Sequence, residues 1–263
     1  MSPLTPIHSR NRSLASLVSD SMVLWHLMRG QRDGDNRTDH AQRLEDFYAP
    51  QAAHYDDFRE RLLHGRQELV ERLAPPPGST VVELGGGTGR NLEFFGARML
   101  SLDRVDVVDL CPALLSQARK RCERWPDVAR AVQADATAYK TGREVDCVFF
   151  SYSLSMIPDW RRALANAVRM LRPGGLLGAV DFYISPQHAS PGTVQHGSLA
   201  RHFWPRWFAH DGVHLSSNHL PALQDYTDRV YCEERMATLP YLPWLRVPYY
   251  LYVGRKRAPH PAG

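Results

Sequence analysis

The sequence predicts an α/β protein with a doubly wound, mostly parallel sheet. Residues 79–183 alternate between short apolar runs and helical segments. A glycine-rich turn joins the first apolar run to a helix, and acids stand at the ends of three successive runs. Strands that alternate with helices of this length form βαβ units, in which helices cover both faces of a parallel sheet.

The composition is that of an ordinary globular protein. Of its 263 residues 43% are apolar and 23% are charged, and this length fits one large domain. No run approaches the roughly 20 apolar residues of a transmembrane helix, and no secretory signal is evident, so we expect a cytoplasmic protein. The net charge of +4 is spread along the chain, which does not indicate a nucleic-acid partner. Four scattered cysteines without a C-x-x-C pair predict neither a zinc site nor a disulfide framework.

Residues 1–41 are expected to form an amphipathic segment followed by a polar loop. Apolar residues, Trp25 among them, recur near helical spacing in LASLVSDSMVLWHLMRG, and Arg10, Arg12 and Arg29 stand at the ends of this apolar face. Such a helix can lie in a membrane interface, or it can pack its apolar face on the core or on a second subunit. The main domain is expected over residues 42–263. It begins with a helical pattern that breaks near Pro50 and stops at residues 75–78.

The strands and helices of the main domain are expected to alternate along most of residues 79–183. The expected strands are 80–84, 104–110, 129–135, 144–152 and 176–183, with two late strands at 229–240 and 247–256. The expected helices are 90–96, 112–125 with Pro112 in its first turn, and 158–171, which Arg172, Pro173, Gly174 and Gly175 should close. Between the fifth strand and the late ones lies an insert rich in aromatic residues and histidine, at about residues 184–226.

The turn in VVELGGGTGR predicts a nucleotide-type site. Glycines let the backbone approach a ligand, and the N–H groups at a helix N-terminus point toward it. The spacing is G-x-G-x-G over Gly85, Gly87 and Gly89, and Arg90 follows where a dinucleotide fingerprint needs Gly or Ala. A phosphate-binding P-loop is excluded as well, because no Gly-Lys-Ser/Thr follows.

The acidic residues around this turn indicate which chemical groups the ligand carries. Glu83 precedes the turn, where a carboxylate would repel a pyrophosphate but attract an ammonium group. Asp109 ends the second strand and can accept from both ribose hydroxyls, and Asp135 ends the third, within reach of an adenine amino group. A ligand with an ammonium group, a ribose and adenine but no phosphate is S-adenosyl-L-methionine. The alternative is that Glu83 caps a helix and the turn is only a tight connection.

The pattern resembles the class I S-adenosylmethionine-dependent methyltransferases over residues 79–182, with LRPGGLL after the fourth helix adding to the match. The resemblance implies a Rossmann-like sheet of seven strands whose last strand is antiparallel. Leu110, Ala136 and Ser151 are the further cofactor-binding candidates. Here the glycines are expected to be bare so that the backbone can lie against the methionine part of the cofactor.

A narrower resemblance extends over residues 42–255. QAAHYDDFRERLLHGRQELVERL, SYSLSMIPDWRRAL and FWPRWFAHDGVHLSSNHLPALQ look like the methyltransferase part of betaine-lipid synthases. Those enzymes methylate the homoserine nitrogen of diacylglyceryl-homoserine three times. The resemblance implies a stand-alone enzyme that works after a separate transferase, which makes diacylglyceryl-homoserine. Its acceptor would be a lipid headgroup, so the enzyme would act at the inner membrane surface as a peripheral protein.

Several residues are candidates for holding this acceptor. Aromatic faces suit the sulfonium and the quaternary nitrogen, and an arginine suits the homoserine carboxylate. The aromatic candidates are Tyr55, Tyr152, Tyr183, Trp204 and Trp207, the arginines are Arg59 and Arg206, and Tyr55 and His210 are the catalytic candidates. Ordinary packing or surface roles are the alternative for each. His210 and His214 have the spacing of a helical metal pair, but Gly212 opposes a helix and a third ligand is not evident, so we expect no metal.

Other functions stay open at this point. A methyltransferase for another lipid headgroup, such as phosphatidylethanolamine, is the alternative within the same class. A cofactor-binding module without catalysis is the alternative outside it. Enzymes that methylate exocyclic base nitrogens resemble one another in an Asp/Asn-Pro-Pro-aromatic turn after the fourth strand, where this chain reads SYSLSMIP, so they are disfavoured. The oligomeric state cannot be predicted.

Overall fold

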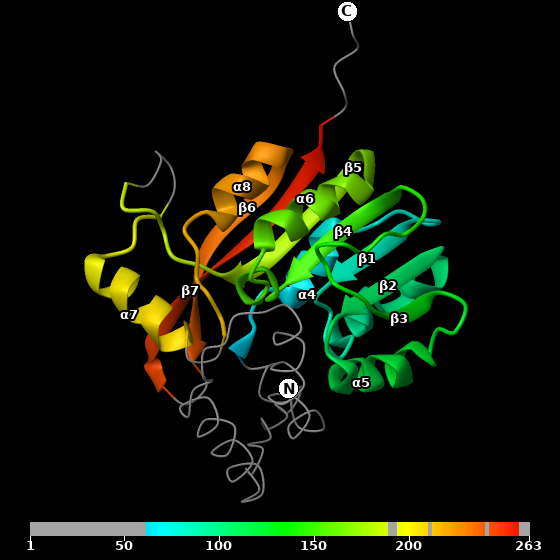
Figure 1. Ribbon diagram of the computed structural model, residues 1–263, viewed down its shortest axis with the longest axis horizontal. Helices are drawn as coiled ribbons and strands as arrows, with labels where there is room; N and C mark the ends of the chain where they lie inside the picture. The colour runs from blue at the N-terminus through cyan, green and yellow to red at the C-terminus, as the bar shows by residue number, and fades with distance from the viewer. Residues whose placement is uncertain (1–61, 189–193, 210–211, 240–241, 258–263) are drawn as a thin grey trace, which may run out of the picture.

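The computed structural model describes residues 62–188, 194–209, 212–239 and 242–257. Its centre is a seven-stranded sheet in the order β3-β2-β1-β4-β5-β7-β6 (Figure 1). The strands are β1 (Thr80–Leu84), β2 (Arg104–Asp109), β3 (Ala129–Gln133), β4 (Val145–Ser151), β5 (Leu171–Phe182), β6 (Thr227–Leu239) and β7 (Leu242–Lys256). The expected amphipathic segment, the polar loop and most of the helical pattern of residues 42–73 lie outside the described residues.

The pairing confirms the predicted topology. Strands β1 to β5 pair in parallel, with β1 at the centre between β2 and β4. Strand β7 is antiparallel to both of its neighbours, β5 and β6, between which it is inserted. Reversal of the strand order at β1 brings the carboxyl ends of β1, β2 and β4 together, where ligands bind in open α/β sheets.

Helices cover both faces of the sheet, as predicted for a doubly wound fold. They are α4 (Arg66–Leu73), the 3₁₀ segment η1 (Arg90–Ser101), α5 (Pro112–Cys122), the 3₁₀ turn η2 (Leu154–Met156), α6 (Trp160–Met170), α7 (Ser198–Ala209) and α8 (His219–Tyr226). Neighbouring residues of β1 point into opposite cores: Val81 packs in one apolar cluster with residues of α4 and α5, and Val82 packs in another with residues of α6 and α8. Strands buried on both faces read as the continuous apolar runs seen in the sequence.

Three sequence-based boundaries need correction. The helix expected after the glycine turn is a 3₁₀ segment, interrupted at Gly96, whose φ of 54° is left-handed. Residues 172–175 do not simply close a helix: they bulge out of β5, since Val145 pairs with Leu171 but Cys147 pairs with Leu176. Finally, Asp135 does not end β3, which stops at Gln133.

Within the described part of the chain, the helices are all too short or too polar to span a bilayer.

Candidate active site

The glycine turn is anchored to the neighbouring strand β2. The N–H groups of Gly85 and Gly86 both donate to the Val108 carbonyl, at 2.8 and 3.0 Å. The N–H of Gly87 donates to Asp109 Oδ2 at 2.8 Å. Left-handed φ angles of 72°, 54° and 69° at Gly85, Gly87 and Gly89 let the backbone turn this sharply, which side chains rarely allow. The turn is therefore a rigid part of the sheet edge.

The reason why a side chain is excluded differs among the glycines of the turn. A Cβ on Gly85 would lie 2.4 Å from Ser153 Cβ, and one on Gly86 would lie 2.6 Å from Val107 Cγ1. Protein atoms therefore fill the space beside these two glycines. The expectation that every glycine of the turn makes room for a ligand is wrong at these two positions. A Cβ on Gly87 would meet only Leu114 Cδ1, at 3.7 Å, so this is the glycine beside which space remains.

Glu83 is fully buried at the end of β1. Its Oε1 accepts from Asn91 Nδ2 at 2.5 Å, whereas its Oε2 has no hydrogen-bond partner among the described residues. Burial raises the pKa of Glu83 to about 8, although the Asn91 hydrogen bond and the charge of Arg66 act in the opposite direction. A buried carboxyl group with one unused oxygen fits a cationic ligand group, since an ammonium would supply the missing donor and charge.

Asp109 ends β2, as predicted. Its Oδ1 accepts from the N–H of Cys111 at 2.9 Å, and its Oδ2 holds Gly87. Asp109 thus lies at the carboxyl end of β2, at the sheet edge where ribose hydroxyls are bound in folds of this kind. Leu110 follows it and is half-buried. Asp109 thus has a structural role in the turn, which the sequence interpretation had not included.

The remaining cofactor candidates lie at the ends of β3 and β4. Asp135 lies two residues beyond β3 and accepts from the N–H of Thr137 at 2.7 Å. The carbonyl of Ala136 accepts from Asn166 Nδ2 at 2.9 Å, which fixes this segment against α6. Ser151 ends β4, and its buried Oγ has no partner within the described ranges. Together with Glu83 Oε2, this gives two unsatisfied buried polar atoms at the carboxyl ends of adjacent strands, which is where a polar ligand would complete them.

Tyr152 has a strained backbone directly after β4. Its φ is 54°, in a region that costs a bulky residue about 1–3 kcal/mol. The hydroxyl donates to the His64 carbonyl at 2.8 Å, and the ring lies 4.6 Å from that of Phe182. Burial raises the pKa of this hydroxyl well above its ordinary value, so Tyr152 offers a ring rather than a base.

The other predicted acceptor residues lie further from the turn. Tyr183 is buried and its hydroxyl donates to Glu234. Trp204 is buried in α7, Trp207 is partly exposed, and Arg206 is exposed with its guanidinium donating to the His202 carbonyl at 3.0 Å. Tyr55, Arg59 and His210 lie outside the described residues, so their roles stay predictions.

Sequence reasoning missed several residues that shape the site. Asn91 bonds Glu83, and Ser153 packs against Gly85 while its hydroxyl donates to the Leu84 carbonyl at 2.7 Å. Buried Asp181 accepts from the N–H and hydroxyl of Ser155 at 2.9 and 2.6 Å, which holds η2 in place. The contact of Asn91 with Glu83 had a signal in the sequence, namely a polar Asn directly before the apolar Leu92. The other contacts join segments far apart in the chain, and no local pattern marks them.

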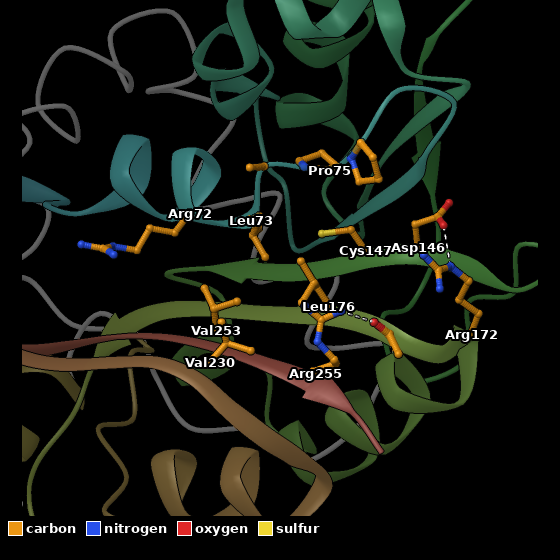
Figure 2. Close-up of a pocket in the computed structure, with 13 residues that line it drawn as sticks. Arg72, Leu73, Pro75, Asp146, Cys147, Arg172, Leu176, Val230, Val253 and Arg255 are labelled. Atoms are coloured by element: carbon orange, nitrogen blue, oxygen red, sulfur yellow. Dashed lines mark hydrogen bonds and ion pairs between the residues drawn. The ribbon is translucent and has the colours of Figure 1, made fainter. Parts of the chain in front are cut away.

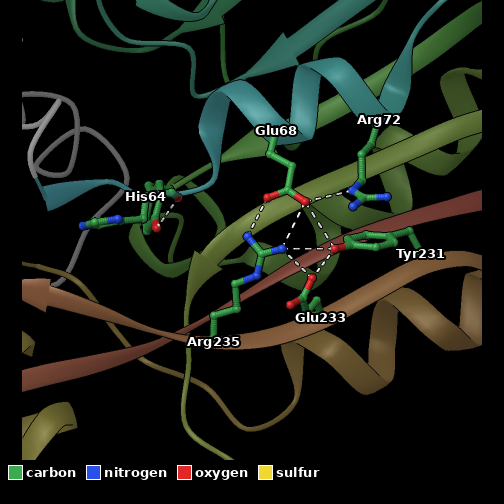
Figure 3. Close-up of polar contacts among 7 residues, drawn as sticks. His64, Glu68, Arg72, Tyr231, Glu233 and Arg235 are labelled. Atoms are coloured by element: carbon green, nitrogen blue, oxygen red, sulfur yellow. Dashed lines mark hydrogen bonds and ion pairs between the residues drawn. The ribbon is translucent and has the colours of Figure 1, made fainter. Parts of the chain in front are cut away.

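A polar cluster joins α4 to β6. Glu68 on α4 accepts from Arg235 at 2.5 and 3.1 Å, from Arg72 at 2.9 Å and from Tyr231 at 3.2 Å, while Arg235 also donates to Glu233 (Figure 3). These bonds lower the pKa of Glu68, with Arg235 the largest cause. The cluster holds α4, whose first residue Arg66 is the buried arginine that acts on Glu83.

A cavity of about 380 Å³ opens at the opposite edge of the sheet. It is lined by arginines and apolar residues near the amino ends of β4 and β5, among them Arg72, Leu73, Cys147, Arg172, Leu176 and Arg255 (Figure 2). Because the glycine turn lies at the carboxyl ends of the parallel strands, this cavity is separate from the candidate site.

Comparison with known proteins agrees with the geometry. Residues 81–175 match a family described as a methyltransferase domain. Relatives of this chain include a ubiquinone/menaquinone biosynthesis C-methyltransferase of Enterobacter sp. (strain 638), 28% identical over 59% of this chain and 64% of the relative. The corresponding enzyme of Paracoccus denitrificans is 32% identical over 51% of this chain and 57% of the relative. The chain thus spans less than two thirds of the length of these two relatives.

Solved structures show the same fold at low sequence identity. The N-methyltransferase NodS of Bradyrhizobium japonicum, in complex with S-adenosyl-L-homocysteine, matches with a TM-score of 0.60 and 20% identity over 83% of this chain and 99% of that one. A Haemonchus contortus phosphoethanolamine N-methyltransferase matches with a TM-score of 0.64 and 14% identity, over 86% of this chain and 61% of that one. These likenesses establish the Rossmann-like methyltransferase fold.

The neighbour NodS was solved with S-adenosyl-L-homocysteine, which is the demethylated form of S-adenosyl-L-methionine. The residues at the sheet edge fit it on their own geometry. Gly87 leaves open space, Glu83 has an unused buried oxygen, and the Asp109 carboxylate lies beside Gly87 at the end of β2. When bound, this cofactor supplies an electrophilic methyl group on sulfur.

Proposed function

We propose that the protein is an S-adenosylmethionine-dependent N-methyltransferase that trimethylates the homoserine nitrogen of diacylglyceryl-homoserine. One observation carries the acceptor side of this proposal: a series of aromatic rings leads away from the carboxyl end of β4. Ring centroids are 4.6 Å apart for Tyr152 and Phe182, 4.9 Å for Phe182 and Phe208, and 5.9 Å for Phe208 and Trp204. Aromatic faces attract cations, and a nitrogen that gains methyl groups becomes a permanent cation.

The chain's own residues have defined tasks in this proposal. Tyr152 presents a ring whose hydroxyl is occupied by His64, so the ring is held in one orientation. The acceptor amine must be neutral to react, and its proton must leave before each transfer. His210 stays the candidate proton acceptor, and Arg59 or Arg206 the candidate partner of the homoserine carboxylate.

The acceptor is tested by direct assay. Purified protein is incubated with isotope-labelled cofactor and either diacylglyceryl-homoserine or phosphatidylethanolamine, and the lipids are resolved by mass spectrometry. We expect mono-, di- and trimethyl products from diacylglyceryl-homoserine. Exclusive methylation of phosphatidylethanolamine would replace the acceptor but keep N-methylation. An absence of cofactor turnover with every acceptor would support a non-catalytic module.

A residue-level test addresses the carboxylate. Arg206→Ala should raise KM for the lipid and leave cofactor affinity nearly intact, because the guanidinium is on α7 and not at the glycine turn. Arg206→Lys is the matched control, since it keeps the charge but loses bidentate geometry. If Arg206→Ala and Arg59→Ala both keep the wild-type KM, the carboxylate is held elsewhere.

A second candidate is methylation of a quinone ring carbon, which the names of the relatives favour. Both candidate acceptors combine a reactive head with a long apolar tail, so they differ mainly in the head. Adding 2-phytyl-1,4-naphthoquinone in its reduced form to the same assay separates them. A carbon-methylated product from it, with none from the amino lipids, would establish this second function.

A further inference from the structure

Helix α7 has two apolar faces, of which only one is used by the core. Trp204 and Phe208 are buried and share a core cluster with Ala237 of β6 and Val247 of β7. On the other side Leu199, Phe203 and Trp207 are 89%, 42% and 39% exposed. Their spacing of four residues places them along one side of the helix, and the rings of Phe203 and Trp207 lie 5.3 Å apart. The exposed stripe is therefore continuous.

All ionisable residues of α7 are basic. The helix SLARHFWPRWFA contains Arg201, His202 and Arg206 and no acid. His202 and Arg206 are both exposed and touch each other through the hydrogen bond from the guanidinium to the His202 carbonyl. An apolar stripe with Trp and Phe, flanked by cations, is complementary to the interface of an anionic membrane, where aromatic residues lie at headgroup level.

The helix is also connected to the candidate active site. Its inner residue Phe208 packs on Phe182, which packs on Tyr152 at the end of β4. In Figure 1, α7 lies at the outer end of the molecule, beyond the sheet strands that carry the site. The end of the β6–β7 hairpin packs in the same cluster, and near it Trp244 is 74% exposed. A surface bound to this end would face the acceptor side of the site.

We propose that α7 is a membrane-docking helix, whose stripe of Leu199, Phe203 and Trp207 inserts into an anionic bilayer surface and brings the carboxyl edge of the sheet to its lipid acceptor. This rests on the proposed function in one respect, namely that the acceptor is a lipid. The docking segment expected from the sequence alone was residues 14–28, which lie outside the described residues; α7 is a different element.

The test uses the full chain and vesicles of phosphatidylcholine with or without phosphatidylglycerol. Co-sedimentation is measured for the wild type and for the double variant Leu199→Glu, Phe203→Glu. Leu100→Glu is the matched control, because Leu100 is 79% exposed in η1, away from α7. We expect the wild type to bind vesicles that contain phosphatidylglycerol, more weakly as salt increases. The double variant should bind about tenfold or more weakly, since it removes two apolar anchors, and the control should bind like the wild type.

Activity distinguishes docking from catalysis. The double variant should keep cofactor binding and turnover of a short-chain, water-soluble acceptor, and lose turnover on vesicles. Equal vesicle binding by wild type and double variant overturns the proposal, as does wild-type protein that binds no vesicles. Loss of binding on removal of residues 1–30 but not in the double variant assigns docking to that segment instead. A wild-type dimer that the double variant dissociates makes the stripe an interface between copies. If binding follows the proposal but no lipid is methylated, docking stands and the proposed function fails.

Discussion

The two edges of the sheet differ in how completely their polar groups are paired. At the amino edge Asp146 accepts from the N–H of Thr80 at 2.8 Å and from Arg172 at 2.6 Å, Arg143 pairs with Asp103, and Arg255 donates to the Gly174 carbonyl. At the carboxyl edge Glu83 Oε2, Ser151 Oγ and Thr137 Oγ1 are buried without a partner among the described residues. Ser79 Oγ is a comparable atom at the amino end.

This difference between the edges indicates that the unpaired polar groups at the carboxyl edge lower stability in return for ligand binding. Each unsatisfied buried polar group costs about 1–3 kcal/mol, and a protein normally avoids that cost. Both edges are formed by the two ends of the same strands, so the comparison is between groups in similar surroundings. Ion pairs satisfy the charged groups at the amino edge, where Ser79 Oγ is the unsatisfied atom noted above, whereas three buried oxygens at the carboxyl edge are in position for a ligand.

The largest expected effect comes from filling the space beside Gly85. Gly85→Ala would place a Cβ 2.4 Å from Ser153 Cβ, and we expect a loss of about 3 kcal/mol or more in the free energy of unfolding, with loss of cofactor binding. Gly142→Ala is the control, because Gly142 has a similar φ of 77° but open space around it, and should cost only about 1–2 kcal/mol. Chemical denaturation measures both. Equal costs would mean that backbone strain alone explains the glycine.

The second effect compares two carboxylates at opposite edges. Asp109→Ala should weaken cofactor binding tenfold or more in calorimetry, because ribose hydroxyls and the Gly87 N–H lose a charged acceptor worth about 1.5–3 kcal/mol. Asp146→Ala removes a similar acceptor of a backbone N–H at the amino edge. It should lower stability by about 1–3 kcal/mol and leave cofactor affinity unchanged. Unchanged affinity in Asp109→Ala would remove Asp109 from the site.

The third effect is the pH dependence of stability due to Glu83. Its pKa in the folded protein is about 8, above the ordinary value of 4.5, so folding takes up a proton between these values. The stability that Glu83 contributes is therefore full below pH 4.5 and is lost as pH rises through about 8. Glu83→Gln removes this titration, so the variant without cofactor should gain stability over the wild type as pH rises, by up to a few kcal/mol.

Urea unfolding of both proteins at about pH 5.5 and about pH 9 measures the difference. A constant difference between wild type and variant at the two pH values would contradict the buried, protonated state of Glu83. In the presence of cofactor the wild type should gain more stability than the variant, because the carboxylate then has a cationic partner.

The smallest effect belongs to the exposed pair of Arg143 and Asp103. Both side chains are about half exposed, and such pairs contribute about 0–1 kcal/mol. Arg143→Ala should therefore change the melting temperature little and cofactor affinity not at all. A larger loss would show that the amino edge depends on this pair more than its exposure suggests.

The sequence predicted the parts of the site that come from single strand ends. Glu83 and Asp109 lie where the alternation of strands and helices put them, because period and turn chemistry are local signals. Asp135 was misplaced by two residues, since the strand stops before its last apolar residue. The 3₁₀ form of η1 was missed because apolar spacing over so few residues does not distinguish a 3₁₀ segment from an α-helix.

Contacts between distant segments could not be predicted in the same way. The explanation for Gly85 lies in Ser153, and the orientation of Tyr152 depends on the His64 carbonyl. Each depends on how two strand ends meet, to within a fraction of an ångström. Composition and periodicity fix which strands are neighbours but not which atoms touch.

The place of β7 in the sheet has a consequence for how the protein forms during synthesis. This strand comes after β6 in the chain yet lies between β5 and β6, and Leu176 of β5 pairs with Arg255. Until residues 242–256 have left the ribosome, the edge of β5 has no neighbour and β6 has no place in the sheet. Such distant pairing is slow because a long loop must close first. The nascent chain therefore exposes an apolar strand edge until late, which makes this stage the most prone to aggregation.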